Sequence, residues 1–152
     1  MKKSKKIIIG LIVIILAIVI IYVLKYDVTR VNTVLVGESE HWKVSYAIKG
    51  YVEFHEKDGV LMSSSDGSYK LVLTYKGDLE EINDITSIGI SGDSSGSALT
   101  SSEPMASSDF NFNGKPHMLT TIAVSQGKPL EYQITWDGKS GGQETITLKY
   151  NH

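Results

Sequence analysis

One stretch of the sequence matches the nucleophile motif of the α/β-hydrolases. The segment from Gly92 to Gly96 reads GDSSG, which has the form G-x-S-x-G, and Asp109 and His117 follow in the Ser–Asp–His order. In such a triad the serine attacks an acyl carbon, the histidine takes its proton and the aspartate orients the histidine. That motif requires a strand–turn–helix in a parallel sheet, and residues 98–104 show no helical pattern. We therefore expect a Ser/Gly-rich loop, and a small serine hydrolase acting through Ser94 remains an alternative function.

A group of carboxylates between residues 78 and 84 has the chemistry of a calcium site. Its members are Asp78, Glu80, Glu81 and Asp84, and Ca²⁺ is bound by several such oxygens. Their spacing does not fit the D-x-[DN]-x-[DN]-G pattern of an EF-hand loop. A solvated acidic loop is the expectation, and a Ca²⁺-dependent adhesion module using the loop Asp78–Asp84 is the second alternative.

Histidine and cysteine provide no further site. The histidines at 41, 55, 117 and 152 are far apart and form no H-x-x-x-H pair, and the chain has no cysteine. A zinc site normally needs such ligands at close spacing. We therefore expect no catalytic centre, no cofactor and no metal site.

The elements that would position any such groups begin with an apolar segment. Residues Ile7 to Leu24 carry no charge, four lysines precede them and Lys25 follows. As a helix, 18 residues reach about 27 Å, enough to cross a hydrocarbon core. The run is longer than the apolar region of a signal peptide, and no A-x-A-like cleavage site follows it. We expect an uncleaved transmembrane helix with residues 1–6 in the cytoplasm and the remainder outside.

The charge differs between the two sides of this segment. All 17 acidic residues lie after Tyr26, together with ten basic residues, so that part has a net charge of −7 although the whole chain has −2. Such a charge gives no support for nucleic acid as a partner. Without cysteine, packing alone must hold this outer domain together.

Strand patterns dominate the outer domain. From Trp42 to Phe54 every even position is apolar or Gly, which predicts a half-buried strand with a bend at Gly50. Asp58-Gly59 predicts a hairpin turn with a short return strand from Val60 to Met62. A second turn at residues 65–68 and a third strand from Tyr69 to Tyr75 follow.

The C-terminal half has the same character. We expect one helical turn within the acidic loop from Asp78 to Asp84, strands at residues 85–90 and 118–125, and a closing hairpin at residues 130–136 and 146–150. The long irregular segment from Gly92 to Lys115 has two candidate edge strands, at residues 97–100 and 109–112. We expect this segment to be the interaction surface, and a disordered loop is the alternative.

The aromatic residues are predicted to lie mainly in the core. Tyrosine and tryptophan also form carbohydrate-binding faces, but here nearly all share the apolar parity of their strands. The residues on that parity are Trp42, Tyr46, Tyr69, Tyr75, Tyr132, Trp136 and Tyr150. Tyr51, on the polar parity, is the exception.

Three segments carry a resemblance to a known group of proteins. They are GESEHWKVSYAI (Gly37 to Ile48), KLVLTYKGD (Lys70 to Asp78) and ITWDGKSGGQETITLK (Ile134 to Lys149). In this order they resemble small, uncharacterised Gram-positive bacterial proteins that are membrane-anchored or lipoprotein-like and carry one extracytoplasmic β-domain. The chain differs in lacking a cysteine for lipid attachment. The resemblance implies a fold and a location, and no activity.

These observations predict an all-β protein. We expect an antiparallel, immunoglobulin-like β-sandwich of seven to eight strands in residues 37–152, joined by a linker (25–36) to the helix at 7–24. The expected function is that of a non-catalytic interaction or structural module of the cell envelope. Its expected partners are the membrane and an envelope protein or the cell wall.

Overall fold

The computed structural model describes residues 12–18, 27–92, 95–101, 103, 105, 107–139 and 141–150. The chain forms two compact units. One comprises Met1–Val28 and Glu53–Ser64, and the other comprises Thr29–Val52 and Ser65–His152.

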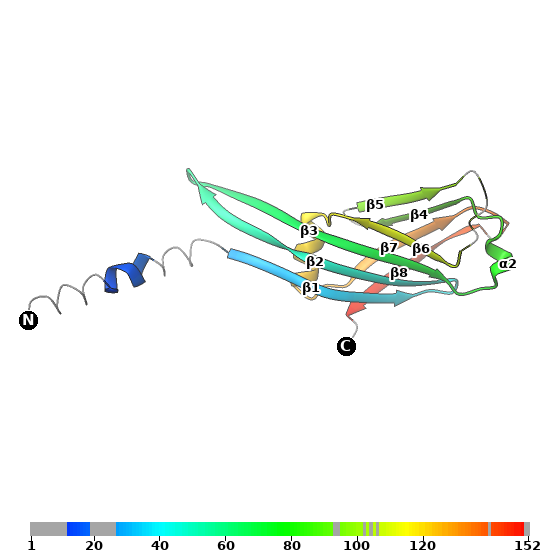
Figure 1. Cartoon of the computed structure of the whole chain (residues 1–152), viewed down its shortest axis with the longest axis horizontal. Helices are drawn as coiled ribbons and strands as arrows, with labels where there is room; N and C mark the ends of the chain where they lie inside the picture. Colours follow the sequence, from blue (N-terminus) through cyan, green and yellow to red (C-terminus); the bar gives the residue numbers. More distant parts are fainter. Residues whose placement is uncertain are drawn as a thin grey trace, which may run out of the picture. The chain divides into compact units, whose positions relative to one another are not determined.

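The larger unit is built on a single antiparallel sheet of eight strands, in the order β5-β4-β7-β8-β1-β2-β3-β6 (Figure 1). The strands are β1 (Asp27–Glu38), β2 (Trp42–Lys57), β3 (Val60–Tyr75), β4 (Ser87–Gly92), β5 (Ser95–Thr100), β6 (Asp109–Gly114), β7 (Leu130–Trp136) and β8 (Gly142–Tyr150). Two helices, α2 (Leu79–Ile82) and α3 (Met118–Ser125), connect them. The predicted antiparallel β-domain of seven to eight strands is thereby confirmed.

The finer expectation of two separate immunoglobulin-like sheets differs from the structure. β1 pairs with β8 through Leu35 opposite Tyr150 and Val36 opposite Lys149, which joins both halves into one nearly closed sheet. The edges are β5 and β6, and the hydroxyl of Tyr69 lies 3.4 Å from that of Ser97 on β5. Alternation in a sequence shows which side chains face inward, but not which strands exchange hydrogen bonds.

The core lies between one half of this sheet, β5-β4-β7-β8, and the other half, β1-β2-β3-β6. Trp42 on β2 packs edge-to-face against Trp136 on β7, with ring centroids 5.5 Å apart, and Tyr46 lies 5.9 Å from Tyr132. The even positions from Trp42 to Ile48 and Val52 are buried as predicted, Gly50 and Phe54 are partly exposed, and Tyr51 is 39% exposed. Tyr69 and Tyr150 are only partly buried, at the margin of the core.

The strand predicted at residues 118–125 is wrong, because this segment is helix α3. Its threonine, isoleucine and valine residues are typical of strands. The ring nitrogen Nδ1 of His117 accepts a hydrogen bond from the backbone N–H of Leu119 at the helix start. Gly127, at φ 71°, follows its end, a common way for a helix to stop. Burial of Val124 and its neighbouring threonines outweighs the intrinsic preference.

The turn predicted at residues 65–68 is also wrong, because β3 runs without interruption from Val60 to Tyr75. Gly67 instead allows a close approach between strands. A Cβ atom on Gly67 would lie 2.4 Å from the carbonyl oxygen of Lys49, and one on Gly50 would lie 2.7 Å from that of Asp66. Glycine is required here by the neighbouring backbone rather than by a turn.

The other predicted elements are present with shifted boundaries. β1 begins at Asp27, within the segment expected to be a linker (25–36), and α2 is the expected helical turn. Much of the segment expected to be irregular, residues 92–115, forms the edge strands β5 and β6. The closing hairpin is β7 and β8.

The smaller unit contains a helix and the end of a hairpin. Asp58 (φ 53°) and Gly59 (φ 76°) form the predicted two-residue turn. Of the apolar segment expected to span a membrane, residues 12–18 form a helix with exposed side chains, and residues 7–11 and 19–24 lie outside the described residues. Within the described part of the chain, no helix has the length and hydropathy needed to cross a bilayer.

Candidate functional site

Of the three residues of the hydrolase-like pattern, Asp109 and His117 lie in the described part of the chain, and each has a separate structural role. Ser94 lies outside the described residues. Asp109 accepts a hydrogen bond from the hydroxyl of Thr74 at 2.7 Å on the outer side of the β3–β6 pair. His117 caps helix α3 through its Nδ1 atom. Both side chains therefore stabilise local structure.

The four carboxylates of the alternative calcium site lie in or beside helix α2, and two of them already have protein partners. Glu81 accepts a hydrogen bond from the hydroxyl of Tyr75 at 2.9 Å, and Asp84 accepts one from the backbone N–H of Lys139 at 2.6 Å. Lys139 also lines the open hollow beside these carboxylates. A basic side chain at this position opposes the binding of a cation.

The histidines do not share one site in the described part of the chain. His41 lies at the β1–β2 turn, His117 at the start of α3, and His55 on β2 in the smaller unit. His152 falls outside the described residues.

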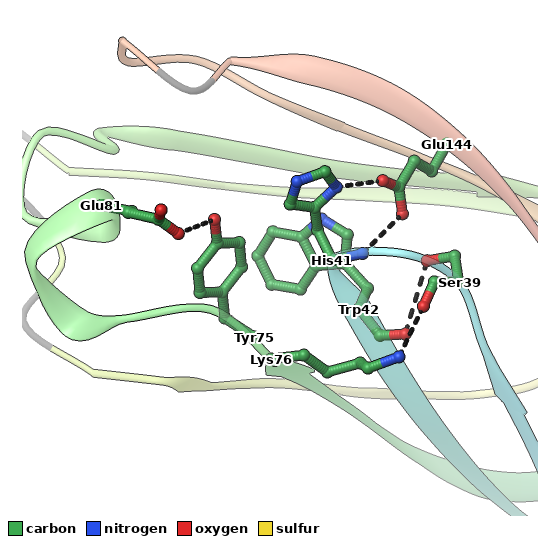
Figure 2. A network of polar contacts seen from close by, with 7 residues as sticks. All are labelled: Ser39, His41, Trp42, Tyr75, Lys76, Glu81 and Glu144. Carbon is green, nitrogen blue, oxygen red and sulfur yellow. Dashed lines mark hydrogen bonds and ion pairs between the residues drawn. The ribbon is translucent and has the colours of Figure 1, made fainter.

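One polar cluster does form, and it joins the β1–β2 turn to strand β8 (Figure 2). Nδ1 of His41 lies 2.5 Å from Oε1 of Glu144, and the backbone N–H of His41 donates to Oε2 of the same carboxylate at 3.3 Å. Lys76 closes the other side of the turn by donating from Nζ to the carbonyl oxygen of Ser39 at 2.8 Å. Residues 103 positions apart are thus fixed together.

The two ionisable groups shift each other's pKa. The hydrogen bond to Glu144 raises the pKa of His41 above 6.5, and partial burial opposes this effect. Burial acts to raise the pKa of Glu144, but hydrogen bonds from Ser39 and His41 outweigh it and leave the pKa below 4.5. Between these two pKa values the pair is an imidazolium and a carboxylate joined by a charge-assisted hydrogen bond.

The ring of His41 packs against two aromatic rings of the core. The His41 ring lies 6.2 Å from that of Tyr75 and 5.8 Å from that of Trp136. Figure 2 shows the Tyr75 ring beside Trp42 with its hydroxyl directed at Glu81. The polar cluster therefore lies directly against one end of the aromatic core.

This cluster also contains the one group of metal-type side chains found within the described residues. Ligand atoms of Glu40, His41 and Glu144 lie within 4.8 Å of one another. The His41 and Glu144 atoms already satisfy each other at 2.5 Å, whereas metal binding would require both to turn to a shared ion. The geometry fits a structural ion pair.

A second candidate surface lies on the outer face of the half-sheet β1-β2-β3-β6. We call it the outer groove and define it by Arg30, Asn32, Lys49, Tyr51, Lys70 and Asn113, which line two open hollows of about 400 and 510 Å³. Asn32 and Lys49 line both hollows, so the two adjoin. On β1, β2 and β3 the residues that define the outer groove alternate with buried residues such as Val31, Ile48 and Leu71.

The outer groove is basic although the domain is acidic. Arg30, Lys49 and Lys70 are exposed, and within the described residues none of them forms an ion pair. Asp66 on β3, whose backbone approaches Gly50 at one hollow, is paired with Lys115 at 3.0 Å. An acidic net charge therefore coexists with a local cationic surface.

Neither the His41–Glu144 cluster nor the outer groove was predicted from the sequence. The His41–Glu144 pair depends on the packing of β8 beside β1, which no short-range pattern reports. The outer groove did have a partial signal, because Tyr51 is the aromatic residue on the polar parity of β2. Lys43 and Lys49 share that parity, and their alignment with Arg30 and Lys70 on neighbouring strands required the register.

Comparison with known proteins gives no relative from which a role could be transferred: no family model, curated protein or solved structure matches the chain.

Proposed function

We propose that this chain is a membrane-anchored, extracytoplasmic, non-catalytic binding module of a bacterial cell envelope. The observation that carries the proposal is the uncharged run from Ile7 to Leu24 with lysines before and after it. Only two residues separate this run from Asp27, where β1 begins. If the run spans the membrane, a connection of two residues would keep the β-domain close to the membrane surface.

The engagement of Asp109 and His117 in local structure supports a binding role over acyl chemistry. Catalytic groups normally converge on one cleft with a nucleophile, base and oxyanion donors in mutual reach. In the same way, the partners of Glu81 and Asp84 leave the calcium alternative without a favouring observation. The resemblance to anchored Gram-positive proteins agrees with the envelope location.

The topology can be tested with the full chain carrying a different tag at each end. In bacterial spheroplasts we expect added protease to digest the C-terminal tag and the β-domain, while the N-terminal tag stays protected. Membranes washed with alkaline carbonate should retain the protein. Recovery of a mature domain in the medium, beginning near residue 26, would show a cleaved signal peptide instead.

A matched pair of variants sharpens this test. Replacing both Ile14 and Leu16 by lysine places two charges at the centre of the proposed span, each costing roughly 2.5–3.5 kcal/mol of insertion free energy. Replacing both by valine keeps the segment apolar. We expect the lysine variant to leave the carbonate-washed membrane and the valine variant to remain in it; equal retention of both would contradict a membrane span.

A further inference from the structure

The outer groove concentrates positive charge that the protein itself does not neutralise. Arg30 on β1, Lys49 on β2 and Lys70 on β3 stand on adjacent strands, which lie about 4.8 Å apart. Lys49 lines one hollow with Arg30 and the other with Lys70, so these like charges gather along the groove and repel one another. An anion placed among them would relieve this repulsion, and a concave cationic site raises the local concentration of anions.

The uncharged residues of the groove match a hydroxyl-rich ligand. The amides of Asn32 and Asn113 can donate to and accept from hydroxyl groups. Both are exposed, as is Ser68 beside them. The ring of Tyr51, 39% exposed on the outer face, offers an apolar surface with a polar tip on which a sugar or polyol can rest.

The shape of the groove favours a linear ligand over a lipid surface. The two adjoining hollows extend across β1, β2, β3 and β6. A flexible chain can follow such a concave path with its anionic groups near successive cations. A bilayer presents a broad face that would also meet the exposed carboxylates Glu38 on β1 and Asp109 on β6.

From this charge, these side chains and this shape, the geometry points to the outer groove as a binding site for a phosphate-bearing glycan or polyol chain. The basic side chains Arg30, Lys49 and Lys70 contact its phosphates, the asparagine amides contact its hydroxyls, and Tyr51 packs on its backbone. This assignment rests on the proposed function, which places the face outside the membrane, where such a polymer is accessible.

Binding is tested with the full chain in nanodiscs of zwitterionic lipid and a fluorescent glycerol-phosphate oligomer of about ten units. We expect saturable binding that weakens as salt is raised, because screening acts on exposed charges. Neutral dextran of similar length should bind at least tenfold more weakly. Equal binding of dextran would overturn the assignment of an anionic ligand.

Charge-matched variants locate the site. Changing Lys49 and Lys70 together to glutamine should lower the affinity for the oligomer at least tenfold. Changing Lys128 and Lys139 to glutamine removes the same charge from exposed positions outside the groove and should alter it less than twofold. Equal losses in the two variants would show non-specific attraction and overturn the groove as the site.

Two further measurements keep the proposal falsifiable. Tyr51→Ala should weaken oligomer binding several-fold while Tyr51→Phe retains it, because stacking needs the ring and not the hydroxyl; equal behaviour of both variants would refute the stacking role. Capture of phosphatidylglycerol vesicles without binding of the oligomer would identify lipid as the occupant and overturn the proposal. The spheroplast experiment reports orientation alone, so its failure is distinguishable from a failure of binding in nanodiscs.

Discussion

The inner and outer faces of strand β2 differ in almost every property although their residues alternate along one segment. Trp42, Tyr46 and Ile48 are at most 2% exposed and pack against the opposite half of the sheet. Lys43, Lys49 and other intervening residues face outward. The buried core and the proposed binding surface therefore lie on opposite faces of one strand, so we expect substitutions on one face to leave the other unchanged.

The sharpest way to break this comparison is to truncate adjacent residues of opposite parity. Trp42→Ala should lower the free energy of unfolding by about 3–5 kcal/mol, because it leaves a cavity among Tyr75, Phe110 and Trp136. Lys43→Ala should change it by no more than about 0.5 kcal/mol. Denaturant titration followed by circular dichroism measures both, and similar losses would contradict the parity of the core.

A smaller effect is expected where the two strands approach each other at the glycines. Gly67→Val places a side chain against the carbonyl oxygen of Lys49 and should cost about 1–3 kcal/mol. Ser65→Val on the same strand is the control, since Ser65 is exposed and the change there should be within about 0.5 kcal/mol. Equal melting temperatures for the two variants would show that the close approach is not required.

The smallest expected effect concerns the His41–Glu144 pair, which closes one end of the core. A raised histidine pKa stabilises the fold below pH 6.5, and this contribution is lost as the pH rises through the folded-state pKa. The lowered pKa of Glu144 adds stability that is present above pH 4.5 and is lost on further acidification. The contribution is therefore largest between these two values.

The substitution His41→Gln tests this dependence, because glutamine can donate a hydrogen bond but carries no charge. At pH 5.5 we expect a loss of about 1 kcal/mol, a modest value because the histidine is 39% exposed and solvent screens the pair. At pH 8.5 the difference should largely disappear. A loss that is independent of pH would indicate packing against Tyr75 and Trp136 rather than charge as the source of stability.

Much of the β-domain could be predicted from local patterns. Alternation identified the inner face of β2 and the closing hairpin, and Asp58-Gly59 identified its turn. Prediction failed at residues 118–125, where strand-like composition forms a capped helix, and at residues 65–68, where glycine serves close packing. In both cases contacts with distant residues outweighed the local preference.

The sequence by itself determined the uncharged apolar run, the separation of basic and acidic segments, and the alternation of β2, β7 and β8, because these depend on residue type and spacing alone. Only the tertiary structure decided that β8 lies beside β1, that Glu144 reaches His41, and that Arg30, Lys49 and Lys70 line adjoining hollows. These juxtapositions depend on strand order and register. Many registers satisfy one alternating pattern, and packing of the whole core selects among them.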